Sequence, residues 1–345
     1  MRALTLQRLL LRCGILAAIL FVVVVIALKL GAVPVSLYGL ARDLISVILG
    51  QRSALSSDYG MIVIDIRLPR ILLGIIVGAS LSVAGTGFQA LLRNPLADPY
   101  VLGVSGGAAV GAILAILLGP HLALAPAVAV LLTPVGAFLG ASGTIAAVYL
   151  LGQRQGEIDN GTLLLAGIIT ASFFSAIIIF LMTTQSSNLR GMSYWLMGDL
   201  SLSPPRSLYV MLVAGFFLAS GIIYTTASDL NLLLSGEKEA MHLGVDVRRV
   251  RLVVYISASI LTGLAVSVSG SIGYVGLLVP HVMRLIFGSD HRTLLPTAAI
   301  GGAIAVVIAD TLARIVVAPA ELPVGAMTAL AGAPLFLYLL RKTTA

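Results

Sequence analysis

The sequence predicts an all-α polytopic membrane protein with about ten transmembrane helices and an inverted internal repeat. Three observations predict this class. The 345 residues are 59% hydrophobic and only 10% charged, whereas a soluble globular protein carries about 25% charged residues. Long apolar runs follow one another along the chain, and a set of small residues in the first half recurs in the second. With a mean hydropathy of +1.08, the chain cannot cover itself with a hydrated surface.

Ten apolar runs approach or reach the length of about 20 residues that a membrane span requires. The first run follows Arg2, Arg8 and Arg12 as the core of a signal peptide would. It is longer than such a core, and no cleavage site follows it cleanly, so we expect an uncleaved first helix. The runs, of which the eighth is short, cover residues 11–33, 62–92, 101–119, 123–151, 161–184, 207–227, 250–271, 276–288, 294–317 and 324–340.

The distribution of Lys and Arg predicts the orientation of the chain. Of the 21 basic residues, 12 fall in segments on the side of the N-terminus, eight fall on the other side, and Arg284 lies within the eighth run. The positive-inside rule therefore places the N-terminus in the cytoplasm, and an even number of spans places the C-terminus there too. The net charge of +7 fits this bias, because no basic run with interleaved aromatic residues indicates nucleic-acid binding.

The repeat relates two groups of four runs, residues 62–184 and 250–340, within one transmembrane domain that covers residues 1–345. The second run is expected to point inward and the seventh outward, so the repeat would be inverted, as in many transporters. A chance recurrence of small and apolar residues is the alternative. The recurring residues are Gly78, Ser82, Val83, Gly85, Leu92 and Pro95, which correspond to Gly263, Ser267, Val268, Gly270, Leu277 and Pro280.

Three polar segments interrupt the apolar runs. Residues 34–60 are expected outside and partly amphipathic, and residues 185–206 are expected outside with the only tryptophan. Residues 228–251 form the longest inner segment and hold the densest charge. Glycines also cluster within the second and third runs, where small residues allow helix backbones to approach closely in lipid.

Motifs for chemistry are missing from the sequence. The run GVSGGAAVG lacks the lysine of a phosphate-binding loop and follows no strand, so helix packing explains it better. No HExxH motif and no pair of histidines occurs, and the single Cys13 excludes a disulfide within the chain. We therefore expect no catalytic residue, no metal site and no bound cofactor in this subunit. Any ATP that drives transport would be hydrolysed elsewhere.

The segment RLPR places Pro69 in the first turn of the second run, where its missing N–H costs nothing. Arg67 and Arg70 are three residues apart and share a face at the outer rim. Arg314 lies at the outer end of the ninth run. These arginines either reach lipid phosphates or form sockets for carboxylates on a docking protein, since charge complementarity sets the register of such encounters.

The segment RNPLADP, residues 93–99, follows the second run at its inner end. Pro95 and Pro99 remove backbone donors and prevent a smooth helical reversal. Irregular backbone at this depth survives only where protein or a water-filled path covers it, which favours a gate. An ordinary turn is the alternative.

The inner segment contains SGEKEAMHLGVDVRR. It predicts a short helix over Glu237–Leu243 that Gly244 ends. The apolar residues LNLLL precede it, so an apolar face lies beside a charged one. A cytoplasmic partner would use such a surface, whereas a solvated loop on anionic lipid is the alternative.

Several of these motifs together resemble the FecCD-type permease family, the ten-helix subunits of type II ABC importers for cobalamin, haem and ferric siderophores. The resemblance runs from about residue 62 to the C-terminus, and the first run matches only in character. It rests on IRLPR, GxxLSVAGTGFQALLRNPLADPYVLGVSGGAA, SYWLMGDLS, LNLLLSGEKEAMHLGVDV, GYVGLLVPHVMRLIFGSDHR and AELPVGAMTALAGAPLFLYLL.

The resemblance implies roles for residues that match the family's motifs. Arg67, Arg70 and Arg314 would receive glutamates of a soluble substrate-binding protein. The cytoplasmic gate would comprise Asn94 and Leu96, with Asp159 and Asn160 from a less securely aligned segment. Residues 229–250 would form coupling helices in a cleft of the ATPase. The ATPase-coupling residues would be Glu237, Lys238, Glu239, Ala240, Met241, His242, Leu243, Gly244 and Val245.

The resemblance also implies an assembly and a location. Two copies of the permease would bind two ATPase subunits, which hold ATP and Mg, in the bacterial cytoplasmic (inner) membrane. Whether the two permeases are identical is left open by the sequence, and we expect a homodimer. The path would follow the axis of the permease dimer, and membrane lipid would surround it.

The identity of the cargo is not determined by any motif. We favour an iron chelate, with haem preferred over a ferric siderophore, and keep a cobalamin importer as the alternative. Arg190, beside Met192, Tyr194 and Met197, would meet haem propionates on the substrate path, or would be a simple interfacial arginine. An ion-coupled secondary transporter is a more distant alternative. It would need buried acidic residues, and only Asp310 lies deep within a predicted span.

Overall fold

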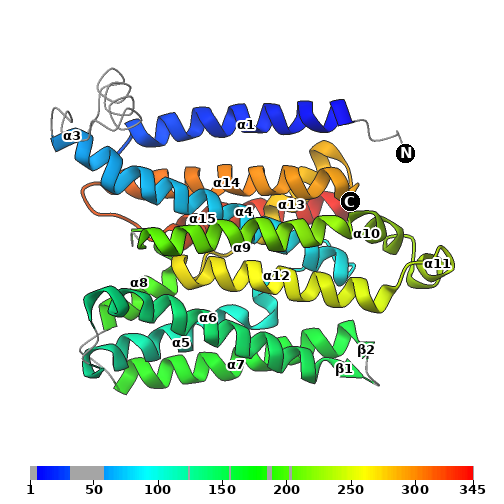
Figure 1. Ribbon diagram of the computed structural model, residues 1–345, viewed down its shortest axis with the longest axis horizontal. Coiled ribbons are helices and arrows are strands. Elements are labelled where there is room, and N and C mark those ends of the chain that lie inside the picture. Colours follow the sequence, from blue (N-terminus) through cyan, green and yellow to red (C-terminus); the bar gives the residue numbers. More distant parts are fainter. Residues whose placement is uncertain are drawn as a thin grey trace.

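Each of the ten apolar runs forms a helix in the computed structural model, which confirms the predicted spans (Figure 1). The structure describes residues 6–31, 58–122, 125–154, 157–184, 189–201 and 204–344. Eight helices in this part of the chain are long and apolar enough to cross a membrane, and two shorter apolar helices, Val275–Phe287 and Val324–Tyr338, complete the ten.

The elements in chain order are α1 (Leu6–Lys29), α3 (Asp58–Met61), the π-helical turn η2 (Ile62–Arg67), α4 (Leu68–Leu91), the 3-10 turn η3 (Pro99–Leu102), α5 (Val104–Leu118), the 3-10 turn η4 (Gly119–His121), α6 (Pro126–Leu151), the paired strands β1 (Gln153–Arg154) and β2 (Glu157–Ile158), α7 (Asn160–Thr184), α8 (Leu189–Met197), α9 (Arg206–Thr225), α10 (Ala227–Leu233), α11 (Glu237–His242), α12 (Val247–Ser269), α13 (Val275–Phe287), α14 (His291–Ile315) and α15 (Val324–Thr344).

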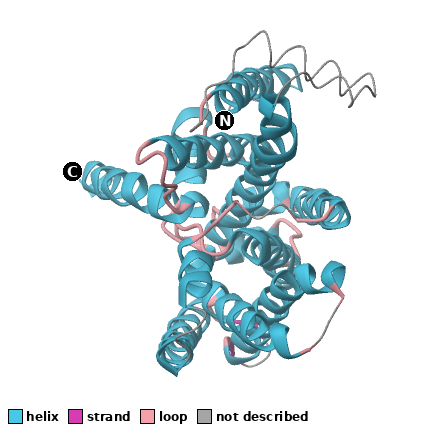
Figure 2. Cartoon of the chain, turned by 90° about the vertical axis from the view of Figure 1, so that its left-hand side faces the viewer, coloured by secondary structure: helices cyan, strands magenta, loops and turns pink. Residues whose placement is uncertain are grey.

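Helix α4 forms the centre of the bundle, and most of its side chains are buried. It packs against α14, α12 and α13, whereas α5, α6 and α7 form a group on one side and α1 lies on the other (Figure 1). Seen end-on, α15 projects from the side of the bundle (Figure 2). Large apolar side chains on α15, including Leu330 and Leu337, are exposed.

Glycines bring the backbone of α4 into direct contact with its neighbours. A Cβ atom on Gly78 would overlap the carbonyl oxygen of Gly302 in α14, and a Cβ on Gly302 would overlap the carbonyl oxygen of Gly78. At Gly85 a Cβ would overlap the carbonyl of Gly276 in α13. Lipid supplies no hydrophobic force between helices, so close packing of this kind holds them together. The predicted role of the helix glycines is confirmed here.

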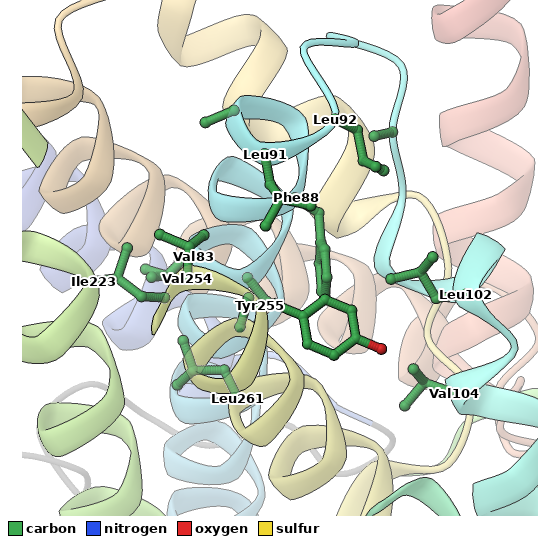
Figure 3. Packing of buried hydrophobic residues seen from close by; sticks show 14 of the residues in the cluster. Val83, Phe88, Leu91, Leu92, Leu102, Val104, Ile223, Val254, Tyr255 and Leu261 are labelled. Carbon is green, nitrogen blue, oxygen red and sulfur yellow. The ribbon is translucent and has the colours of Figure 1, made fainter. Parts of the chain in front are cut away.

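One hydrophobic cluster of the core contains aromatic and aliphatic side chains from α4, α9 and α12 (Figure 3). Phe88 meets Tyr255 edge to face, with ring centroids 6.0 Å apart. The Tyr255 hydroxyl donates a hydrogen bond to the carbonyl oxygen of Ile145 in α6, at 2.9 Å. A buried tyrosine needs such a partner, and this bond also joins the α5–α7 group to the central helices.

The two ends of the bundle carry different elements (Figure 1). Helices α10 and α11, the β1–β2 hairpin, the start of α1 and the end of α15 lie at one end, which we call the inner end. Helices α3 and α8 lie at the opposite, outer end. The arrangement agrees with the predicted even number of spans, and the assignment of the inner end to the cytoplasm stays a prediction.

The polar segments differ in how well they were predicted. The short helix expected over 237–243 is α11, and Gly244 ends it with a φ of +85°. Helix α10, just before it, overlaps the segment 229–250 in which the resemblance implied coupling helices. Most of the segment 34–60 lies outside the described residues. Each predicted repeat half contains four helices, α4–α7 and α12–α15, and their relation by inversion stays a prediction.

Candidate functional site

A buried ion cluster joins α4 and α14 at the outer end. Arg70 Nε donates to Oδ1 of Asp310 at 2.8 Å, and Arg314 Nε donates to Oδ2 of the same carboxylate at 3.1 Å. The exposed fractions of these three side chains are 6%, 2% and 5%. One carboxylate thus compensates two guanidinium groups, and the remaining donors of the arginines need further acceptors.

The last turn of α1 supplies several of these acceptors. Arg67 Nη1 donates to the carbonyl oxygen of Leu28 at 2.7 Å and to that of Lys29 at 3.2 Å. Arg314 reaches the carbonyl oxygens of Ala27 at 3.3 Å and Leu30 at 3.4 Å. The last carbonyl groups of a helix lack partners within it, and cations are favourable there. Arg67, Arg70 and Arg314, predicted as outer-rim cations, therefore lie together, and Arg67 and Arg314 fasten α1 to the bundle.

Arg67, Arg70, Arg314 and Asp310 together form what we call the outer arginine cluster. A contact of Arg70 connects this cluster with the surface. Arg70 Nη1 donates to Oε2 of Glu321 at 2.6 Å, and the Glu321 side chain is 45% exposed. Glu321 belongs to the ELP segment between α14 and α15. Sequence reasoning missed both acids as partners of the arginines. The i,i+4 spacing of Asp310 and Arg314 was the only available signal.

A second ion cluster lies at the inner end. Glu237, the first residue of α11, accepts a hydrogen bond from Arg251 near the start of α12. The same oxygen forms an ion pair with Arg93 Nη2 at 2.6 Å. Arg93 begins the RNPLADP segment and has a φ of +48°. Glu237 therefore links the predicted coupling helix directly to the predicted gate.

The gate segment itself is held by local hydrogen bonds. Asn94 Oδ1 accepts from the backbone N–H of Leu96 at 2.9 Å, and Leu96 exposes 38% of its apolar side chain. Asp98 accepts from the N–H of Tyr100 at 2.9 Å and starts η3. Burial raises the pKa of Asp98 to about 6, although this hydrogen bond opposes the shift.

The other predicted gate residues lie at the start of α7. Asp159 Oδ2 accepts from the backbone N–H and the hydroxyl of Thr162, at 2.8 and 2.6 Å. Asn160 is the first residue of α7. Asp159 therefore caps a helix, which is the usual role of an aspartate at this position. The role of Asp159 and Asn160 in a gate stays a prediction.

Helix α10 anchors the predicted coupling segment to α14. Asn231 Nδ2 donates to Asp290 Oδ1 at 2.7 Å, and Asn231 Oδ1 accepts from the N–H of His291 at 2.8 Å. Asp290 also accepts from Arg292 as the N-cap of α14. Hydrogen bonds from Arg292, together with the one from Asn231, lower the pKa of Asp290 to about 2.

Helix α8 carries the residues proposed for the substrate path. The Arg190 guanidinium lies 5.9 Å from the centroid of the Tyr194 ring. Tyr194 and Met197 are 40% and 52% exposed, but Met192 is fully buried and packs into the core. A cavity of about 420 Å³ beside α8 is lined by Tyr194 and Asp199, among others. The structure thus separates Met192 from the three exposed residues with which it was predicted.

Comparisons with known proteins give a consistent result. Residues 19–342 match the FecCD transport family. The hemin transport system permease HmuU of Yersinia pestis is 44% identical over 287 residues, or 81% of this chain and 83% of that protein. The cobalamin import system permease BtuC of Halobacterium salinarum is 44% identical over 281 residues, or 81% of this chain and 73% of that protein. A solved structure described as an inward-facing metal-chelate type ABC transporter has a TM-score of 0.78 and 32% identity, and covers 96% of this chain and 98% of that one.

We predict that Asp310→Asn destabilises the protein by about 3 kcal/mol, because it leaves two buried guanidinium groups without their shared carboxylate. Glu321→Gln is the matched control, since it removes an exposed acid from the same cluster and should cost less than about 1 kcal/mol. Melting of each variant in detergent, followed by size-exclusion chromatography, measures the difference. Equal melting temperatures for the two variants would contradict the assigned role of Asp310.

Proposed function

The chain belongs to the FecCD transport family and is a permease of a type II ABC importer, and we propose that its cargo is an iron chelate, with haem preferred over a ferric siderophore. The observation that carries this choice is Arg190. It lies exposed on α8 over the Tyr194 ring, and no carboxylate among the described residues forms an ion pair with it. The Arg190 guanidinium at this point attracts carboxylates such as haem propionates. The side chains of cobalamin are mostly amides, which attract a cation less strongly than carboxylates do.

The permease would work as a homodimer with two ATPase subunits, which bind ATP and Mg. The sequence has no phosphate-binding loop, so the energy must come from a separate subunit. The exposed apolar side chains of α15 give the second permease a surface to pack against, since exposed patches of this kind mark interaction sites. Asp310 is not a free ion-binding acid, because two arginines hold it. This pairing is a further argument against an ion-coupled mechanism.

The outer arginine cluster would be the docking site for a soluble substrate-binding protein. Arg70 is the member with a route to the surface, through Glu321. We infer that Glu321 occupies the position that a glutamate of the binding protein takes on docking. An exchange of one carboxylate for another would leave the charge balance of the cluster unchanged, and it would keep α1 fastened throughout.

The inner cluster would couple ATP hydrolysis to the gate. Met241 and Leu243, at the end of α11, are 54% and 65% exposed at the inner end of the bundle. An ATPase that covers these apolar side chains would move α11, and Glu237 would transmit that movement to Arg93. The Asn231–Asp290 contact would transmit it to α14 in parallel.

The cargo can be tested in proteoliposomes that contain the permease, its ATPase and its binding protein. We expect haem to stimulate ATP hydrolysis most strongly, followed by a ferric siderophore. Arg190→Gln should weaken the response to haem without lowering the basal ATPase rate. Stimulation by cobalamin alone would replace the iron chelate with the alternative cargo. Uphill transport by the isolated permease on an ionic gradient would contradict the ABC mechanism.

The docking proposal predicts opposite effects for two neighbouring changes. Glu321→Gln should raise the affinity for the binding protein up to about fivefold, because it frees Arg70 from an exposed competitor. Arg70→Gln should lower that affinity. Surface plasmon resonance on the assembled permease–ATPase complex measures both, and intact assembly serves as the folding control. An unchanged affinity in both variants would exclude Arg70 from docking.

The coupling proposal predicts that Glu237→Gln lowers transport per ATP hydrolysed roughly tenfold, the equivalent of one charge-assisted hydrogen bond. The ATPase should still co-purify with the permease. The double exchange Arg93→Glu with Glu237→Arg should restore part of the coupling. Arg8→Gln is the matched control, because Arg8 is an exposed arginine at the same end of the bundle but outside the coupling segment. Full coupling in the Glu237→Gln variant would refute the link.

A further inference from the structure

An apolar groove of about 580 Å³ separates α1 from α9. Its floor consists of α4 and α14, and its walls include Cys13 and Leu20 of α1 and Phe216 of α9. All four helices are membrane-spanning candidates. The groove is therefore within the membrane, where the available occupant is lipid.

The position of α1 explains why the groove exists. The outer end of α1 is held by Arg67 and Arg314. Near its inner end, Arg12 Nη1 donates to the carbonyl oxygen of Phe287 at 3.2 Å. Between these two attachments only Leu16 is buried in the described part of α1, whereas Cys13 and Leu20 are only partly covered. Protein side chains thus leave space along the middle of the helix.

The dimensions of the groove suit one acyl chain of one leaflet. Along α14 it runs from Leu295 to Ala303, which is about 12 Å at the helical rise of 1.5 Å per residue. Half of a hydrocarbon core measures about 15 Å. The Ser220 hydroxyl lines the groove and has no hydrogen-bond partner among the described residues. The ester carbonyl oxygen of a phospholipid would accept a hydrogen bond from the Ser220 hydroxyl.

Two arginines of α1 precede Cys13, at the inner end of the groove. Arg8 and Arg12 are four residues apart and share one face of α1; Arg12 is half-buried where it contacts Phe287, and Arg8 is exposed. Neither forms an ion pair with a carboxylate in the described parts of the chain, although the Arg12 guanidinium also lies 5.7 Å from the centroid of the Phe287 ring. Arginine side chains bind phosphate through paired hydrogen bonds. Basic pockets between transmembrane helices on the cytoplasmic side bind anionic headgroups.

We propose that this groove holds one acyl chain of an anionic phospholipid, such as phosphatidylglycerol, whose phosphate is bound by Arg8 and Arg12. The lipid completes the contact between α1 and the bundle that protein side chains leave open. Charge selects the headgroup, and the apolar walls accept the chain.

The single cysteine of the sequence provides a direct readout, because Cys13 lines the groove. The full-length permease, purified with its ATPase and stripped of lipid in detergent, is alkylated with a maleimide, and the modification of Cys13 is followed by mass spectrometry. We expect phosphatidylglycerol to slow this reaction and phosphatidylcholine to have little effect. In an Arg8→Gln, Arg12→Gln variant, the phosphatidylglycerol concentration for half-maximal protection should rise roughly 20-fold.

Two further variants serve as controls for charge and for occupation of the groove. The double exchange Arg248→Gln, Arg249→Gln removes the same two charges from the inner end of the bundle but lies outside the groove lining, so it should behave as the wild type. Ala299→Leu places a larger side chain on the groove floor and should abolish protection with both arginines present, which covers the case in which the double variant does not fold. Equal protection by both lipids would overturn the selection of an anionic headgroup. If Cys13 were protected only in permease dimers, and without added lipid, the groove would belong to the contact with a second copy of the chain. If no lipid protected Cys13, the proposal of a bound lipid would be wrong.

Discussion

Direct backbone contact between α4 and its neighbours is the constraint on which the rest of the structure depends. Gly78 lies against Gly302, and Gly85 lies against Gly276, without room for a side chain. Because apolar surfaces gain little from association in lipid, this close packing fixes where α13 and α14 lie. Arg70 on α4 then meets Asp310 on α14, and the end of α4 delivers Arg93 to Glu237.

Both functional clusters are therefore attached to one rigid element. Arg70 and Arg93 are separated by α4, a distance of about 35 Å at the helical rise. The two clusters differ in burial. In the part of the chain that the structure describes, the outer one is almost closed to solvent and reaches the surface at Glu321, whereas Arg93 and Glu237 are each 35% exposed. The inner contact is thus the easier of the two to break and remake, as a contact that changes during a transport cycle should be.

Much of the fold was predictable from periodicity and length alone. The apolar runs identified every long helix, and Glu237 to Gly244 had the composition and stop signal of a short one. The arginines of RLPR were recognised as a group, but their burial was not, because the partners of Arg70 lie 240 and 251 residues away. Pairing across such a distance leaves no trace in local sequence. The link between Arg93 and Glu237 was hidden for the same reason, and the cargo depends on a dimer path that one chain does not define.

The fastening of α1 has a consequence for how the protein is made. The carbonyl groups at the end of α1 are bonded by Arg314, which is 284 residues from Leu30. During synthesis α1 enters the membrane first and α14 almost last, so the carbonyl groups of Ala27 and Leu30 must wait for Arg314 while the ribosome adds nearly the whole chain. Over that interval Arg67 is the arginine available to hold the outer end of the nascent first helix, and the bonds from Arg314 form in one of the closing steps of assembly.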